Sequence, residues 1–125
     1  LFDFRLHAEF SPEQGAKILE TLAEIKKQVA VIPGPTWGRF PHAFSHIFAG
    51  GYAAGYYSYK WAEVLDADAF AAFKEAGIFN KEVAGSFYKN ILSKGGTEDP
   101  MELYIRFRGQ KPEINALLKR NGIKN

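Results

Sequence analysis

The sequence lacks cysteine altogether, and its 125 residues carry little excess charge of either sign. Disulfide bonds and thiolate metal sites are therefore excluded, which is compatible with the cytoplasmic localisation that we expect. The 16 basic and 14 acidic residues leave a formal net charge of +2. Basic pairs such as Lys26-Lys27 stand beside acids rather than in a stripe that could follow phosphates. We therefore expect no nucleic-acid partner.

Charged residues are missing between Arg39 and Lys60, a stretch about as long as a membrane span of roughly 20 residues. This stretch nevertheless contains His42, His46 and four tyrosines, whose polar groups would be costly in hydrocarbon. We therefore expect the stretch to face water or a cleft, and we expect no membrane partner.

Hydrophobic residues make up 46% of the chain, enough for one compact core. Apolar positions recur at helical spacing and no useful run alternates as a strand would, so we expect an all-α, multi-helical fold. We expect residues 1–125 to form a single helical unit, and the start at Leu1 without methionine suggests a piece of a longer polypeptide. The predicted helices are a segment around residues 1–7, about five turns from Ser11, Tyr52 to about Ala76, one capped by Asn80, one from Asp99-Pro100 to Arg108, and one from Pro112 to Gly122.

His42 and His46 stand four residues apart, the spacing of two zinc-binding histidines on one helical face. In the protease motif with this spacing, a glutamate follows the first histidine and acts as the general base. Here Ala43 occupies that position, and no nearby carboxylate offers an obvious third ligand. We therefore expect no metal site in this chain.

A helix that begins at Tyr52 would place Tyr52, Tyr56, Tyr59 and Glu63 on one face, at roughly 100° per residue. Gly50-Gly51 precedes this face and permits backbone conformations that other residues resist. The pattern thus predicts a row of phenolic hydroxyls next to a glycine loop.

Two interpretations of this row remain open on the pattern alone. An aromatic stripe at helical spacing is usually core packing, and a glycine pair is usually a turn. Four tyrosines within eight residues favour a function, because a buried phenol needs a hydrogen-bond partner that phenylalanine would not need. The chain has 11 phenylalanines elsewhere, so the hydroxyls look selected.

The segment from Phe44 to Leu65 resembles the C-terminal signature of the thimet oligopeptidase family of zinc metallopeptidases. Its sequence is most similar to that of the bacterial oligopeptidase A branch. Further similarities touch nearly the whole chain and occur at Leu1 to His7, at Gly95-Gly96, at Pro100 to Leu103 and at Phe107 to Gly109.

The resemblance implies the C-terminal portion of the catalytic domain of a zinc-dependent endopeptidase that hydrolyses oligopeptides in a channel between two helical halves. The family's zinc-binding helix, with its His-Glu-x-x-His motif, and the glutamate ligand lie upstream of the region seen here. This chain would accordingly hold no zinc, would need the upstream half of the same polypeptide as its partner, and would be inactive alone.

The resemblance also implies roles for individual residues. His46 corresponds to the family's substrate-contacting histidine. The family's mobile loop corresponds to Ala49 to Gly51, in which Gly50 and Gly51 are the substrate-binding candidates. Tyr52 corresponds to a substrate-binding tyrosine and Tyr59 to the tyrosine that donates to the scissile carbonyl oxygen. Tyr56 lies between them and is a further substrate-binding candidate.

Two other functions fit the same residues. A dipeptidyl carboxypeptidase shares the tyrosine and glycine run, and it would need a cation for the terminal carboxylate of its substrate. A non-catalytic helical module could instead bind a peptide or a partner helix on the tyrosine face.

Overall fold

The computed structural model describes residues 1–123 and is helical, with no strand among them, so the all-α prediction is confirmed. None of the helices in this part of the chain is both long and apolar enough to cross a membrane. The chain divides into two compact units, Leu1–Ser58 and Tyr59–Asn125. The prediction that the chain forms one portion of a single catalytic domain stays a prediction.

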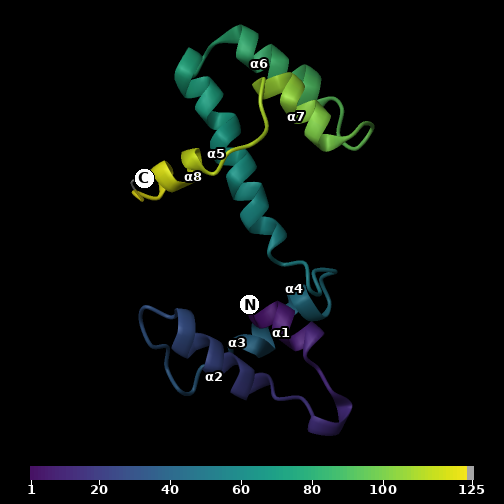
Figure 1. Cartoon of the computed structure of the whole chain (residues 1–125), viewed down its shortest axis with the longest axis vertical. Helices are drawn as coiled ribbons and strands as arrows, with labels where there is room; N and C mark the ends of the chain where they lie inside the picture. Colours follow the sequence, from purple (N-terminus) through teal and green to yellow (C-terminus); the bar gives the residue numbers. More distant parts are fainter. Residues whose placement is uncertain (124–125) are drawn as a thin grey trace. The chain divides into compact units, whose positions relative to one another are not determined.

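The first unit contains four α-helices and one 3-10 turn, of which α1 packs against α2 (Figure 1). Their bounds are α1 Phe2–Ala8, η1 Pro12–Gln14, α2 Ile18–Val29, α3 Phe40–Ala43 and α4 Ser45–Phe48. The core of this unit joins α1, α2 and α4 through Phe2, Leu22, Ile25 and Ile47. Ile47 is only 1% exposed, and burying such a side chain contributes about 1.5–3 kcal/mol.

The predicted five-turn helix from Ser11 is wrong at its start. Ser11 makes no capping hydrogen bond through its side chain, and the helical turn that follows is a 3-10 turn of three residues. Gly15 then has φ 71° and ψ 179°, a conformation that glycine adopts at little cost but that no helix can continue. The α-helix therefore begins only at Ile18.

The predicted helix from Tyr52 to Ala76 also begins later than expected, at Ser58. Ala54 has φ 52°, in the left-handed region, and a chain of turns occupies residues 53–57. The single helical face proposed for four side chains is therefore wrong, since only Tyr59 and Glu63 of that set lie on α5. The left-handed residue interrupts the helix because successive right-handed turns cannot pass through it.

The second unit contains the longest helix of the described chain, α5, and two helices that begin with a side-chain cap. Their bounds are α5 Ser58–Ala76, α6 Lys81–Phe87, the π-helical η2 Tyr88–Leu92, α7 Pro100–Arg108 and α8 Asn115–Arg120. The two caps predicted in this unit are confirmed: the Asn80 side chain accepts from two backbone N–H groups at the start of α6, and Asp99 does the same at the start of α7. Such caps stabilise a helix by roughly 1 kcal/mol each.

Aromatic rings hold α5, α6 and α7 together, and α6 and α7 run side by side (Figure 1). Phe87 and Phe107 meet edge to face at 5.1 Å between ring centroids, and Phe73 contacts both rings. The last helix starts at Asn115 rather than at the predicted Pro112. Leu117 is buried as expected, whereas Ile114 precedes the helix and is 53% exposed.

Candidate functional site

The short helix α4 turns the chain back on itself and brings Tyr52 next to His46. The backbone N–H groups of Ala49 and Gly50 both donate to the carbonyl oxygen of Ser45, at 2.7 and 3.0 Å. The N–H of Tyr52 then donates to the carbonyl oxygen of His46 at 3.1 Å. The segment from His46 to Tyr52 is therefore a closed loop with Gly50 and Gly51 at its tip.

Both glycines of this loop have a structural reason to be glycine. A Cβ atom on Gly50 would lie 2.8 Å from the His46 Cα atom and 3.0 Å from its carbonyl oxygen, so the loop backbone could not approach as it does. Gly51 has φ 79° and open space around it, which makes its requirement conformational. The loop thus needs one glycine for space and one for its backbone angle, whereas its mobility stays a prediction.

The rings of His46, Tyr52 and Tyr56 form a group that we call the histidine–tyrosine cluster. The imidazole centroid lies 5.8 Å from the Tyr52 ring and 5.6 Å from the Tyr56 ring, the latter edge to face. Phe44 packs edge to face on Tyr56 at 4.7 Å. Each such pair contributes about 0.5–1.5 kcal/mol beyond the area that it buries. The structure therefore brings three of the predicted site residues together.

The cluster is not sealed in the core. His46 is exposed, Tyr56 is 37% exposed and Tyr52 is half-buried. Packing fixes the ring orientations while part of each ring still faces solvent. A phenol can donate and accept a hydrogen bond, and an imidazole N–H can donate one, so the cluster has the chemistry to hold a peptide backbone.

Asp3 holds the turn that follows the loop. Its carboxylate accepts from the backbone N–H of Ala54 at 2.8 Å through Oδ1 and from that of Tyr56 at 2.9 Å through Oδ2. His7 Nδ1 lies 2.9 Å from the same Oδ1 atom and 2.8 Å from the Asp3 carbonyl oxygen. Only 6% of Asp3 is exposed.

The sequence analysis missed Asp3, although the sequence carries a weak signal. The residue interrupts the otherwise apolar run Leu1-Phe2-Asp3-Phe4, and a histidine follows one helical turn later. An acid within an apolar helix face is rarely buried unless it is paired, so the run indicates a buried pair. Nothing in it identifies the backbone partners, which lie more than fifty residues further along the chain.

Tyr59 lies in the first turn of α5 and belongs to the second unit. It is 41% exposed. One turn further on, Glu63 accepts from Lys60 Nζ at 2.9 Å. The start of α5 therefore presents a partly exposed phenol on a regular helix, a stiffer support than the turns that carry Tyr52 and Tyr56.

The histidines with zinc-like spacing do not share a helix. His42 lies in α3 and His46 in α4, and Phe44, with φ −93° and ψ 58°, separates the two. Among residues 1–123 there is no group of three or more His, Asp or Glu side chains that could hold a metal ion. The residues described here therefore do not fit a zinc site.

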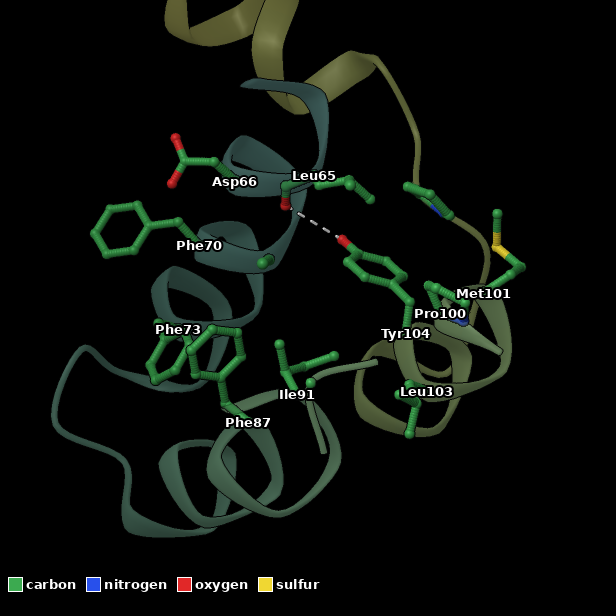
Figure 2. A pocket seen from close by; sticks show the side chains of 13 residues that line it. Leu65, Asp66, Phe70, Phe73, Phe87, Ile91, Pro100, Met101, Leu103 and Tyr104 are labelled. Atoms are coloured by element: carbon green, nitrogen blue, oxygen red, sulfur yellow. Dashed lines mark hydrogen bonds between the residues drawn. The ribbon is translucent and has the colours of Figure 1, made fainter. Parts of the chain in front are cut away.

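The second unit contains a cavity of about 530 Å³ whose lining is mainly apolar. It lies among α5, α6, η2 and α7, and none of the predicted site residues lines it (Figure 2). Tyr104 lies on its wall, with its hydroxyl directed toward the Leu65 carbonyl oxygen at 3.5 Å and donating more strongly to Asp68 Oδ2 at 2.6 Å. Burial, together with the bond to Asp68 and the charge of that carboxylate, raises the pKa of the Tyr104 phenol above its usual value.

Tyr104 and Asp68 belong to a polar group of the second unit that also contains Arg108 and Glu75. Arg108 donates two hydrogen bonds to Glu75, at 3.0 and 2.9 Å, and its Nε lies 3.7 Å from Asp68 Oδ2. Asp68 is 3% exposed. These contacts join α5 to α7, which indicates a structural role for the group.

Residues 1–123 match the family described as Peptidase family M3. The chain is 73% identical over 124 residues to oligopeptidase A of Salmonella typhimurium and to that of Escherichia coli, and each alignment covers 99% of this chain and 18% of the relative. It is 44% identical over 80 residues to the dipeptidyl carboxypeptidase of Escherichia coli, an alignment that covers 64% of this chain and 12% of the relative. The chain thus spans 18% of the length of these oligopeptidases A.

Proposed function

Since the chain belongs to peptidase family M3, we propose that it supplies the substrate-handling side of a longer, zinc-dependent oligopeptidase. The resemblance to the oligopeptidase A branch that was found in the sequence is confirmed by the family match and by the identity to oligopeptidases A. The observation that carries the proposal is the partly exposed histidine–tyrosine cluster, which is held on a loop that requires both of its glycines. The substrates would be short peptides, and the working partner would be the upstream half of the same polypeptide.

Each site residue has a role that its chemistry allows. His46 and Tyr59 would donate to the carbonyl oxygen of the scissile peptide bond, on which negative charge develops during hydrolysis. Tyr52 and Tyr56 would bind the peptide, and Gly50-Gly51 would let the loop close over it. Zinc, when bound, activates water and polarises a carbonyl group, and its ligands would lie outside residues 1–123.

Donors of this kind accelerate a reaction only where they bind the transition state more tightly than the substrate. The loss of one such donor lowers turnover by about 10² to 10³-fold. The partial exposure of Tyr59 and His46 supports this use, because a donor must reach the substrate from the protein surface.

Metal removal from the full-length protein tests the proposal. We expect a chelator to abolish hydrolysis of a short fluorogenic peptide and stoichiometric zinc to restore it, measured by turnover and by metal analysis. Residues 1–125 alone should bind no catalytic zinc and cleave no peptide. Stoichiometric zinc together with peptidase activity in this piece would contradict the proposal.

We also propose that the intact enzyme is cytoplasmic, so cell fractionation should recover it in the cytoplasmic fraction.

A dipeptidyl carboxypeptidase is the second candidate, favoured by the 44% identity over 80 residues. Such an enzyme needs a free C-terminal carboxylate on its substrate, whereas an endopeptidase does not. We expect the full-length protein to cleave internal bonds of a C-terminally amidated peptide, followed by mass spectrometry. Release of dipeptides from free C-termini alone would favour the second candidate, and peptide binding without any cleavage would favour a non-catalytic binding module.

A further inference from the structure

Asp3 and Asp68 are the two buried acidic side chains among the described residues, with 6% and 3% of their surface exposed. A buried carboxylate is costly unless hydrogen bonds or a counter-charge compensate it. Asp68 is compensated by a phenol and lies near a guanidinium group of the second unit. Asp3 is instead compensated by two backbone N–H groups of a distant turn and by the His7 ring.

The turn that Asp3 holds contains a residue in a costly backbone conformation. Ala54 is the one residue other than glycine with positive φ in the described chain, a conformation that costs roughly 1–2 kcal/mol. The N–H groups of Ala54 and Tyr56 precede α5 and donate to the Asp3 carboxylate. Hydrogen bonds to a charged acceptor are stronger than neutral ones, so the carboxylate can compensate the strained turn.

The turn is fixed at both ends next to the histidine–tyrosine cluster. At its start, the Tyr52 N–H donates to the His46 carbonyl oxygen. At its end, the Tyr56 N–H donates to Asp3, and the Tyr56 ring packs edge to face on His46. The direction of the Tyr56 side chain is therefore set by a backbone that Asp3 anchors.

We propose that Asp3 is a positioning residue for peptide binding, which holds the turn at residues 54–56 and thereby orients Tyr56 and Tyr52 against His46. His7 contacts the same carboxylate through Oδ1, the oxygen atom that also accepts from Ala54. The effect on peptides rests on the proposed function, whereas the effect on the turn does not. Asp3 touches no substrate in this arrangement and acts only through the cluster.

The test compares Asp3→Asn with Asp68→Asn in the full-length protein. Asparagine keeps the size of aspartate but loses the charge and presents an NH2 group to one of the two backbone N–H donors. We expect Asp3→Asn to raise KM for short peptides roughly tenfold with a smaller change in kcat, because the binding tyrosines are misplaced. Asp68→Asn should lower Tm and leave KM unchanged. An equal rise in KM in both variants would overturn the proposal.

Amide hydrogen exchange measures the turn without relying on activity. We expect faster exchange at Ala54 and Tyr56 in Asp3→Asn and unchanged exchange there in Asp68→Asn, because Asp3, unlike Asp68, accepts from these two amides. If Asp3→Asn does not fold, His7→Ala leaves the two backbone bonds in place and should produce smaller changes of the same kind. Unchanged exchange in the variant that folds would overturn the proposal.

A double-mutant cycle separates positioning from general stability. If Asp3 acts through the cluster, Asp3→Asn should raise KM much less in a Tyr56→Phe background than in the wild type. Fully additive effects would overturn the proposal. If the wild-type protein cleaves no peptide, the proposed function fails, and the exchange experiment still decides whether Asp3 holds the turn.

Discussion

The two units use their buried carboxylates in opposite ways. In the first unit, Asp3 binds backbone N–H groups of an irregular turn beside a partly exposed group of rings. In the second unit, Asp68 binds the Tyr104 phenol between regular helices. The same chemical group therefore fixes a loop conformation in one unit and joins two helices in the other. Under the proposed function, the carboxylate of the first unit would lie beside substrate-binding rings, whereas the carboxylate of the second unit would serve stability.

The two units also differ in how their helices begin. The α-helices of the first unit have no side-chain hydrogen bond at their N-caps, whereas Asn80 and Asp99 cap α6 and α7 of the second. Local chemistry thus specifies much of the second unit. Both units also contain hydrogen bonds between residues far apart in the chain, but only the second unit has these caps, so we expect substitutions to affect the two units differently.

The largest difference should come from the two histidines. In the full-length protein, His46→Ala should lower kcat for a short peptide by about 10² to 10³-fold, because it removes a donor to the developing oxyanion. His42→Ala, at an exposed position in α3, should leave kcat within about twofold of the wild type, since surface changes have small effects. Steady-state kinetics on both variants checks this, and equal losses would remove the distinction between the two histidines.

A smaller effect is expected at the glycines. Gly50→Ala would place a Cβ atom 2.8 Å from the His46 Cα atom, so the His46 backbone must move. We expect kcat/KM to fall roughly tenfold or more, since displacements of about 1 Å at a site can cost up to 10²-fold. Gly96→Ala meets nothing within 4 Å and should preserve kcat/KM. If Gly50→Ala had normal kinetics, the close approach would have no catalytic consequence.

The next prediction concerns thermal stability and a substitution in the second unit. Tyr104→Phe deprives Asp68 of its 2.6 Å donor while keeping the aromatic ring. A buried group left without its partner costs about 1–3 kcal/mol, so Tm should fall while kcat and KM stay unchanged. Thermal unfolding and kinetics on the same sample measure both. A fall in kcat at unchanged Tm would place Tyr104 in the working site instead.

The smallest effect is a change in the alkaline stability profile. The folded-state pKa of Tyr104 is raised above the ordinary value of 10.0 by burial and by Asp68. The stability from this phenol is therefore fully present below pH 10 and is lost as pH rises above 10, because the unfolded phenol ionises first. The stability difference between wild type and Tyr104→Phe should shrink above pH 10 in denaturant titrations. A constant difference across that range would contradict the shifted pKa.

The sequence predicted the features that depend on neighbouring residues. Asp99-Pro100 and Asn80 identified two helix starts, because a cap acts on N–H groups two and three residues later. The family resemblance identified the residues that the first unit gathers, His46 and Tyr52 among them. The functional roles of these residues stay predictions.

The sequence could not predict features decided by distant contacts or by single backbone angles. The alanine and tyrosine run looked helical from Tyr52, but Ala54 adopts a left-handed conformation that the carboxylate of Asp3 supports from far away in the sequence. Gly15 similarly interrupted a helix whose cap and periodicity looked continuous. In both places a tertiary or conformational preference outweighed local helix propensity.

The most direct test of a catalytic role for the exposed phenols is Tyr59→Phe in the full-length protein, with Tyr88→Phe as the control at another exposed tyrosine. We expect kcat for a short peptide to fall at least about 10²-fold in Tyr59→Phe, with Tm close to that of the wild type, and we expect no change in Tyr88→Phe. Early unfolding of Tyr59→Phe with normal turnover would show that this hydroxyl serves packing, and would contradict the assignment of this segment to catalysis.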